Sequence, residues 1–263
     1  MKLRFLGTGT STGNPEIGCH CEVCRSQDPK DNRLRASVLI QSHGKNILID
    51  CGPDFRMQML ETLKYQPQIN RLDAVLLSHE HYDHVGGIDD LRPFCKHAAV
   101  NIYGESSLTA TIKERMPYAF GENKYPGTPS INLHAIDLNP FVVEGIEIKP
   151  IRIMHAKLPI MGYRIGALAY LTDVKTIPEE SFALLENLDV LIIDALRPQA
   201  HISHQTIDEA LAHIERIKPQ KAYLIHMSHD FGLHALMEKQ MPQNVFVAYD
   251  GLELTIAEAL STH

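Results

Sequence analysis

Aliphatic and β-branched residues gather in short runs along the chain, separated by polar segments or by segments that contain glycine or proline. Runs of this kind predict strands, here at residues 2–6, 37–41, 46–50, 74–78, 146–153, 169–172, 190–194, 222–225 and 245–248. Apolar positions at helical spacing, with proline or aspartate near several starts, predict helices at residues 53–63, 105–115, 178–187, 206–217 and 233–239. The pattern therefore predicts an α/β protein.

The order of these segments indicates two sheets covered by outer helices. Strands of the first half follow one another as hairpin-like pairs, for example on either side of residues 42–44, whereas later strands alternate with helices. Residues 116–129 contain three prolines and two glycines and break the periodicity. We expect a long loop there, either a lid or binding loop or a plain surface connection.

Composition and charge narrow the class of protein. The chain has 263 residues, of which 44% are hydrophobic, so we expect a single domain over residues 1–263. Its formal net charge of -7 provides no global basic field, and we expect neither a stable nucleic-acid complex nor membrane binding. The first apolar run is too short for a signal peptide or a membrane span, which predicts a cytoplasmic protein.

The most informative motif is Ser-His-Glu-His-Tyr-Asp-His at residues 78–84, directly after an apolar strand and before a pair of glycines. In an extended segment, residues two apart point the same way, so His79 and His81 can grip one metal ion. The turn that follows presents Asp83 and His84 to another ion. The 15 histidines of the chain, many of them beside aspartate, agree with metal chemistry.

This motif resembles the hallmark of the metallo-β-lactamase superfamily, and the resemblance implies a four-layer αββα sandwich over nearly the whole chain. That family takes further ligands from later strand ends, and His155, Asp173 and His226 follow apolar runs in the expected order. The resemblance implies that the first metal is held by His79, His81 and His155, the second by Asp83, His84 and His226, and that Asp173 bridges the two.

Two divalent ions in one site lower the pKa of a shared water and polarise the substrate oxygen, so hydrolysis is the expected reaction. Asp83 is then expected to contribute to catalysis as well as to metal binding. Histidine and aspartate ligands accept several metals, and we expect manganese or zinc. Asp50, in an Asp-Cys-Gly segment that matches the family's Asp-x-Gly, is expected to support the ligand turn rather than to bind metal.

A second metal site is predicted by the cysteines. Cys19, Cys21 and Cys24 supply three thiolates on one short loop, and tetrahedral zinc takes one more ligand. His229, three residues beyond His226, offers it, and such a structural zinc would fasten the N-terminal loop beside the catalytic centre. The alternative is that these are ordinary loop cysteines, as we expect of the two remaining cysteines, at positions 51 and 95.

Together, the cysteine motif and the His226-Met227-Ser228-His229 ending resemble the phosphoribosyl cyclic phosphodiesterase (PhnP-like) family. That family places a catalytic histidine after a Val-Leu-Ile-Ile-Asp strand, which His204 matches best, with His201 as its rival. We expect His204 to protonate the leaving alkoxide of a small cyclic phosphodiester, a task suited to imidazole. A simple helix-capping role for this segment is the alternative.

Two further elements could contact the phosphate: the glycine-rich segment 6–11, through its backbone amides, and Arg197. An exposed arginine with no such role is the simpler account of Arg197. A homodimer is expected only because the family that this chain resembles forms dimers.

Several other functions share the same metal motif. A nuclease that processes transfer-RNA 3′ ends would carry a basic insertion, which this acidic chain lacks. A thioesterase, a β-lactamase or a member of a cofactor pathway remains an alternative that only substrates can decide. A non-catalytic metal-binding protein would be expected to have lost ligands, yet all seven positions are filled.

Overall fold

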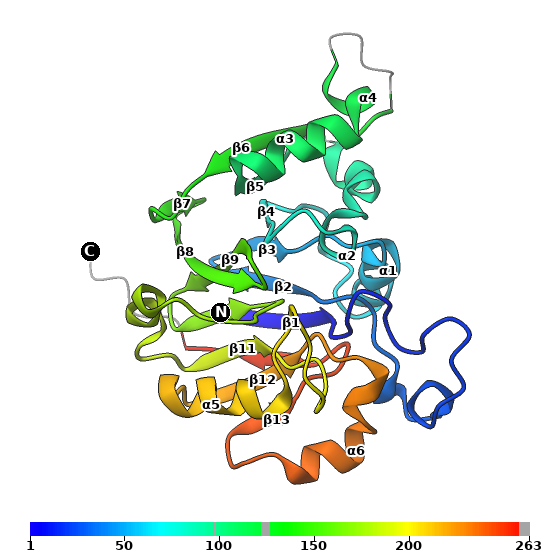
Figure 1. Ribbon diagram of the computed structural model, residues 1–263. Helices are drawn as coiled ribbons and strands as arrows, with labels where there is room; N and C mark the ends of the chain where they lie inside the picture. The colour runs from blue at the N-terminus through cyan, green and yellow to red at the C-terminus, as the bar shows by residue number, and fades with distance from the viewer. Residues whose placement is uncertain (97, 122–126, 258–263) are drawn as a thin grey trace.

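Two seven-stranded sheets form the centre of the molecule in the computed structural model, which describes residues 1–96, 98–121 and 127–257 (Figure 1). The first sheet has the order β14-β1-β2-β3-β4-β5-β6 and the second has the order β13-β12-β11-β10-β9-β8-β7. The first sheet consists of β14 (Glu253–Thr255), β1 (Lys2–Gly7), β2 (Ser37–Ser42), β3 (Lys45–Ile49), β4 (Ala74–Leu76), β5 (Val100–Glu105) and β6 (Ile131–Ile136). The second consists of β13 (Val245–Val247), β12 (Lys221–Ile225), β11 (Val190–Asp194), β10 (Leu168–Leu171), β9 (Leu158–Ile165), β8 (Ile146–His155) and β7 (Phe141–Val143).

Helices cover the outer face of each sheet. The α-helices are α1 (Phe55–Tyr65), α2 (Tyr82–Val85), α3 (Ser106–Arg115), α4 (Pro117–Phe120), α5 (Ile207–Ile217) and α6 (His234–Met237). The 3₁₀ segments are η1 (Val23–Arg25), η2 (Pro29–Asp31), η3 (Ile88–Lys96), η4 (Glu179–Leu185), η5 (His229–Phe231) and η6 (Glu238–Gln240). Helices α1 and α3 lie on the side of the first sheet, and α5 on the side of the second (Figure 1).

Alternation along the strands explains this layering. Ile192 of β11 points into the core shared by the two sheets, whereas Leu191 and Ile193 point to the outer core that α5 covers. Successive side chains of a strand face opposite sides of a sheet, so a strand that is apolar throughout must be covered on both faces. The predicted αββα sandwich is confirmed.

The elements that carry the functional motifs lie close to their predicted positions. Helix α1 begins two residues later than expected and α5 one residue later, while residues 178–187 form the 3₁₀ segment η4 rather than an α-helix. The region 116–129 is not a plain loop, because α4 begins at Pro117. Residues 122–126 of that region lie outside the described part. None of the helices that the structure describes is long and apolar enough to cross a bilayer.

Parallel strands bring the polar residues that follow them to one edge of the sandwich. β3 pairs in parallel with β4, and β10, β11 and β12 pair in parallel with one another. The carboxyl ends of neighbouring parallel strands lie at the same edge, which is where open α/β sheets bind ligands. Asp50 and His226 directly follow such strands, and Asp173 comes two residues after the end of β10. All three take the left-handed conformation, with φ of 61° for Asp50, 58° for His226 and 55° for Asp173.

Candidate metal centre

The histidine motif leaves β4 as an extended segment and then forms the short helix α2. His81 precedes α2 with φ -64° and ψ 147°, and α2 presents Asp83 and His84 to the interior. Glycine permits this tight arrangement: a Cβ at Gly52 would lie 2.0 Å from the Asp83 carbonyl oxygen. The amide of Cys51 donates to the His84 carbonyl at 2.8 Å, which fixes the turn.

Three histidines of the first predicted metal site meet at the edge of the sandwich. The ring centroids are 4.4 Å apart for His79 and His81, 5.5 Å for His79 and His155, and 5.2 Å for His81 and His155. Each offers one nitrogen within 4.8 Å of the others and of an Asp173 oxygen. These four residues come from three separate strand ends, so only the fold brings them together.

The residues predicted for the second metal meet beside them. His84 Nε2 lies 3.1 Å from an Asp83 oxygen and 3.1 Å from Asp173 Oδ1. His226 Nε2 lies 3.3 Å from the same Asp173 oxygen. Asp173 thus belongs to both groups of potential ligands.

The donor atoms fit divalent cations. The Nε2 atoms of His79 and His226 are buried, yet neither makes a hydrogen bond within the part of the chain that the structure describes. Burial by itself raises the pKa of a carboxyl, but His226 and His84 hold the pKa of Asp173 well below its usual value. Buried imidazole nitrogens and ionised carboxylates that converge on common points form a ligand set for zinc or manganese.

Asp50 supports this centre without joining it. Its carboxylate lies 2.7 Å from His84 Nδ1 and accepts from the amide of Ser78 at 2.8 Å. A carboxylate on the far nitrogen of a metal-binding histidine fixes the tautomer and orients the ring. This is the supporting role that the sequence predicts for Asp50.

His204 lies against the same cluster. Its ring centroid is 4.6 Å from that of His155 and 4.8 Å from that of His226, and the residue is only 8% exposed. His201, the rival general acid, lies farther out, with its ring centroid 5.2 Å from His204 and its Nδ1 accepting from the Ser203 amide. Partial burial and the neighbouring His204 lower the pKa of His201. His204 is therefore the histidine in contact with the predicted ligands.

Asp194 is a functional residue that our sequence analysis missed. This fully buried carboxylate ends β11 and lies 2.9 Å from His204 Nδ1. Burial raises the pKa of Asp194, although His204 partly offsets this. The signal that could have found it is its place as a carboxylate that ends a buried strand, which it shares with Asp50 and Asp173.

The groups predicted to contact phosphate have partners within the protein. The amides of Gly9 and Thr10 donate to the carbonyls of Leu34 and Met227, so these two cannot bind phosphate, and that expectation is wrong for them. A Cβ at Gly9 would lie 2.9 Å from Arg33, so this glycine serves close backbone packing. Arg197 pairs with Asp230 at 3.1 Å and remains partly exposed.

The cysteine cluster assembles as predicted. One ligand atom each from Cys19, Cys21, Cys24 and His229 lie within 4.8 Å of one another. His229 Nδ1 lies 3.2 Å from the Cys19 sulfur and 3.4 Å from the Cys21 sulfur. Burial by itself raises the pKa of the Cys21 thiol, but hydrogen bonds from Cys24 and His229 outweigh it and lower this pKa to about 6. A pKa this low favours a thiolate. Three cysteines and a histidine make a closed tetrahedral set for zinc.

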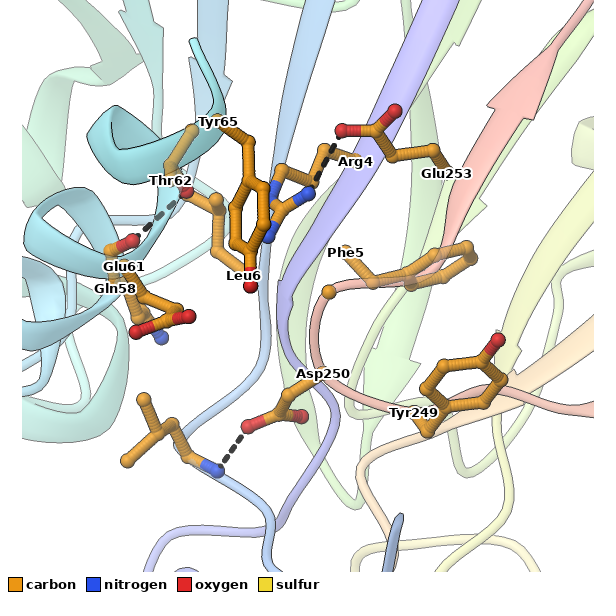
Figure 2. Close-up of a pocket in the computed structure, with 12 residues that line it drawn as sticks. Arg4, Phe5, Leu6, Gln58, Glu61, Thr62, Tyr65, Tyr249, Asp250 and Glu253 are labelled. Atoms are coloured by element: carbon orange, nitrogen blue, oxygen red, sulfur yellow. Dashed lines mark hydrogen bonds and ion pairs between the residues drawn. The ribbon is translucent and has the colours of Figure 1, made fainter. Parts of the chain in front are cut away.

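A separate cavity of about 450 Å³ lies between α1 and the turn before β14, and none of the predicted metal ligands lines it. Figure 2 shows its walls, with Tyr65 and Arg4 on one side and Asp250 on another.

Comparisons with known proteins agree with this geometry. The family described as "Beta-lactamase superfamily domain" matches residues 45–227. The crystal structure of a new diphosphatase from the PhnP family superposes with a TM-score of 0.89 at 37% identity, covering 97% of this chain and 98% of that one. Zinc-bound PqqB from Methylobacterium extorquens shares the fold at 19% identity, with a TM-score of 0.77 over 97% of this chain and 100% of that one.

Among curated proteins, an octanoyltransferase of Porphyromonas gingivalis is 47% identical over 98% of this chain but only 52% of its own length. The coenzyme PQQ synthesis protein B of Xanthomonas oryzae is 26% identical over 55% of this chain and 52% of its own length. The chain thus spans about half the length of these curated relatives.

Proposed function

Because this chain belongs to the beta-lactamase superfamily and, within it, to the PhnP family, we propose that it is a dinuclear metal-dependent phosphodiesterase for small substrates. The broader statement, a hydrolase with the metallo-β-lactamase fold, follows from the family. The substrate class, the metals and the residue roles are our proposal. The observation that carries it is His204, held by Asp194 and in contact with the ligand cluster around Asp173.

The proposed metal ligands form two sets that share one residue. His79, His81 and His155 would hold one cation, Asp83, His84 and His226 the other, and Asp173 both. When bound, such a pair of cations makes water nucleophilic at neutral pH and offsets the negative charge that gathers on phosphorus. The supporting Asp50 keeps His84 in the orientation that this requires. Manganese and zinc both suit the donor atoms.

His204 would act as the general acid. Asp194 accepts from Nδ1 of His204, which leaves Nε2 facing the ligand cluster, 3.9 Å from an Asp173 oxygen. An imidazolium in this position can donate its Nε2 proton to the oxygen that leaves phosphorus. An alkoxide needs such a proton, because it is a poor leaving group. The arrangement therefore favours small cyclic or alkyl phosphodiesters as substrates.

The test is hydrolysis by metal-free protein reloaded with manganese or zinc. Substrates are bis(p-nitrophenyl) phosphate, a 2′,3′-cyclic nucleotide and an alkyl diphosphate, the last because the PhnP-family relative is a diphosphatase. We expect turnover that requires metal and that falls in His81→Ala. The matched control is His134→Ala, which removes an exposed histidine on β6. A folded, metal-loaded protein that hydrolyses neither phosphodiester would refute the proposal, and turnover of the diphosphate alone would assign the site to phosphoanhydrides.

A second candidate, thioester hydrolysis, is favoured by one observation. The curated relative that is 47% identical carries the name octanoyltransferase, although this chain matches only about half of it. An octanoyl thioester in the same panel separates the two functions. Turnover of the thioester without turnover of any phosphodiester would assign the site to acyl substrates.

A further inference from the structure

One turn carries a ligand of each predicted metal site. His226 belongs to the dinuclear centre and His229, three residues later, to the cysteine cluster. His226 has φ 58°, a left-handed conformation that is unfavourable for a residue other than glycine. Such a conformation persists only where the surrounding structure holds it.

The backbone of residues 8–10 holds this turn. Met227 donates its amide to the Thr8 carbonyl at 3.1 Å, and its carbonyl accepts from the Thr10 amide at 3.1 Å. Ser228 donates to the Leu196 carbonyl at 3.0 Å. The position of His226 therefore depends on the position of Thr8.

The side chain of Thr8 is fixed in turn by two polar side chains, those of Asp250 and Arg33. Its hydroxyl donates to Asp250 Oδ1 at 2.7 Å and accepts from Arg33 Nη1 at 2.9 Å. The other Asp250 oxygen accepts from the Leu34 amide at 2.7 Å, which appears as a dashed line in Figure 2. Arg33 is only 3% exposed and also donates to the Ala248 carbonyl at 2.5 Å.

The same network reaches the cysteine loop. Arg33 Nη2 lies 3.3 Å from His234 Nδ1, and the His234 amide donates to Asp31 at 2.7 Å. Asp31 also accepts from the hydroxyl of Ser26, two residues after Cys24, at 2.6 Å. Hydrogen bonds thus connect the loop of the cysteine cluster, through Arg33 and Thr8, to the turn that carries His226.

We propose that Thr8, Arg33 and Asp250 are positioning residues for the turn His226–His229, and that they set the metal affinity of the dinuclear centre through His226. The proposal assumes the metal sites but not the proposed reaction. A buried hydrogen-bond network with every member paired fixes one arrangement, and removing one member leaves the others without partners. The turn then gains freedom to relax its left-handed residue, and the nitrogen of His226 leaves its place opposite Asp173.

The variant Thr8→Val tests this because valine keeps the shape and loses the hydroxyl. The control is Thr62→Val, which removes another buried hydroxyl, one that donates to the Gln58 carbonyl in α1 at 2.8 Å. Metal-free proteins are titrated with cobalt(II) and followed by absorption, since thiolate-bound cobalt absorbs differently from cobalt bound by histidine and aspartate. We expect the histidine and aspartate centre to lose roughly 10-fold in cobalt affinity in Thr8→Val. This is the lower end of the effect of losing a direct partner of a metal ligand, because the Thr8 hydroxyl acts on His226 only through the backbone. The affinity of this centre should be unchanged in Thr62→Val.

Equal cobalt affinities in Thr8→Val and Thr62→Val would overturn the proposal. If Thr8→Val does not give the circular dichroism of the folded wild type, Asp250→Asn decides the matter. This variant keeps the shape of the side chain but replaces one of its two acceptor oxygens, so that either Thr8 or Leu34 loses its partner. Weakened cobalt binding by folded Asp250→Asn supports the proposal, and wild-type binding contradicts it. No substrate enters these titrations, so a failure of the phosphodiesterase proposal leaves their outcome unaffected.

Discussion

The pairing of Asp194 with His204 allows the proposed general acid to be separated from metal binding. The contact measures 2.9 Å, and Asp194 is fully buried. A hydrogen bond to a charged group contributes about 1.5–3 kcal/mol. If this contact holds the His204 ring in position for proton transfer, its loss in Asp194→Asn should lower kcat for a substrate with an alkoxide leaving group by about 10- to 150-fold. His204→Ala removes the acid altogether and should lower it by about 10²- to 10⁴-fold.

The leaving group distinguishes this role from a structural one. p-Nitrophenolate departs without a proton at neutral pH, so hydrolysis of bis(p-nitrophenyl) phosphate should fall far less in both variants than hydrolysis of a 2′,3′-cyclic nucleotide. The assay compares kcat/KM for the two substrates in wild type, Asp194→Asn and His204→Ala. Metal content is measured on each sample, because Asp194 also lies 3.9 Å from His226 Nδ1.

Two results would refute the reasoning. Equal losses for both substrates would mean that Asp194 acts on the fold or on the metals rather than on proton transfer. No loss with the cyclic nucleotide in a metal-loaded His204→Ala would remove His204 from catalysis, and His201→Ala would then be the variant to measure.

Three predictions concern stability. Thr206 caps α5 in a capping box with Glu209, so Thr206→Ala should lower the free energy of unfolding by about 1 kcal/mol in urea titrations, while Thr206→Ser retains the cap. Ile192 is fully buried between the sheets, so Ile192→Ala should cost about 2–5 kcal/mol and Ile192→Val about 0.5–1.5 kcal/mol, and equal costs would contradict its placement. Burial raises the pKa of Asp250 to about 7. The folded state therefore keeps a proton that the unfolded chain releases near pH 4. Wild type accordingly loses stability as the pH rises from about 4 to 7. The melting temperature of Asp250→Asn should therefore rise relative to wild type between about pH 4 and 7, and a constant difference would contradict the shift.

Much of the site could be predicted because its signals are local. The ligands of the histidine motif lie within residues 79–84, and the three cysteines lie within six residues. His226 directly follows an apolar strand, and Asp173 comes two residues after another. A strand that is buried on both faces must be apolar, so a polar residue at its end stands out in the sequence.

Some strands escaped prediction for physical reasons. β9 contains Pro159 and Gly162, which weaken any strand signal, yet its backbone pairs with β8 along its whole length. A Cβ at Gly162 would lie 2.4 Å from the side chain of Leu171, so the glycine reflects close packing within the sheet. β5 and β6 also went unpredicted, since they are stabilised by pairing with partners distant in sequence.

The sequence by itself indicated the α/β class and the ligands of the histidine motif, because periodicity and motif spacing are properties of neighbouring residues. Its resemblance to a known family implied the later ligands and a hydrolytic reaction. Only the tertiary structure decided that Asp194 faces His204 and that Thr8, Arg33 and Asp250 lie beneath the turn of His226. A carboxylate or an arginine looks the same in sequence whether it is solvated or buried. Its role depends on which distant groups the packed sheets bring within hydrogen-bonding distance, and on the burial that makes such contacts strong.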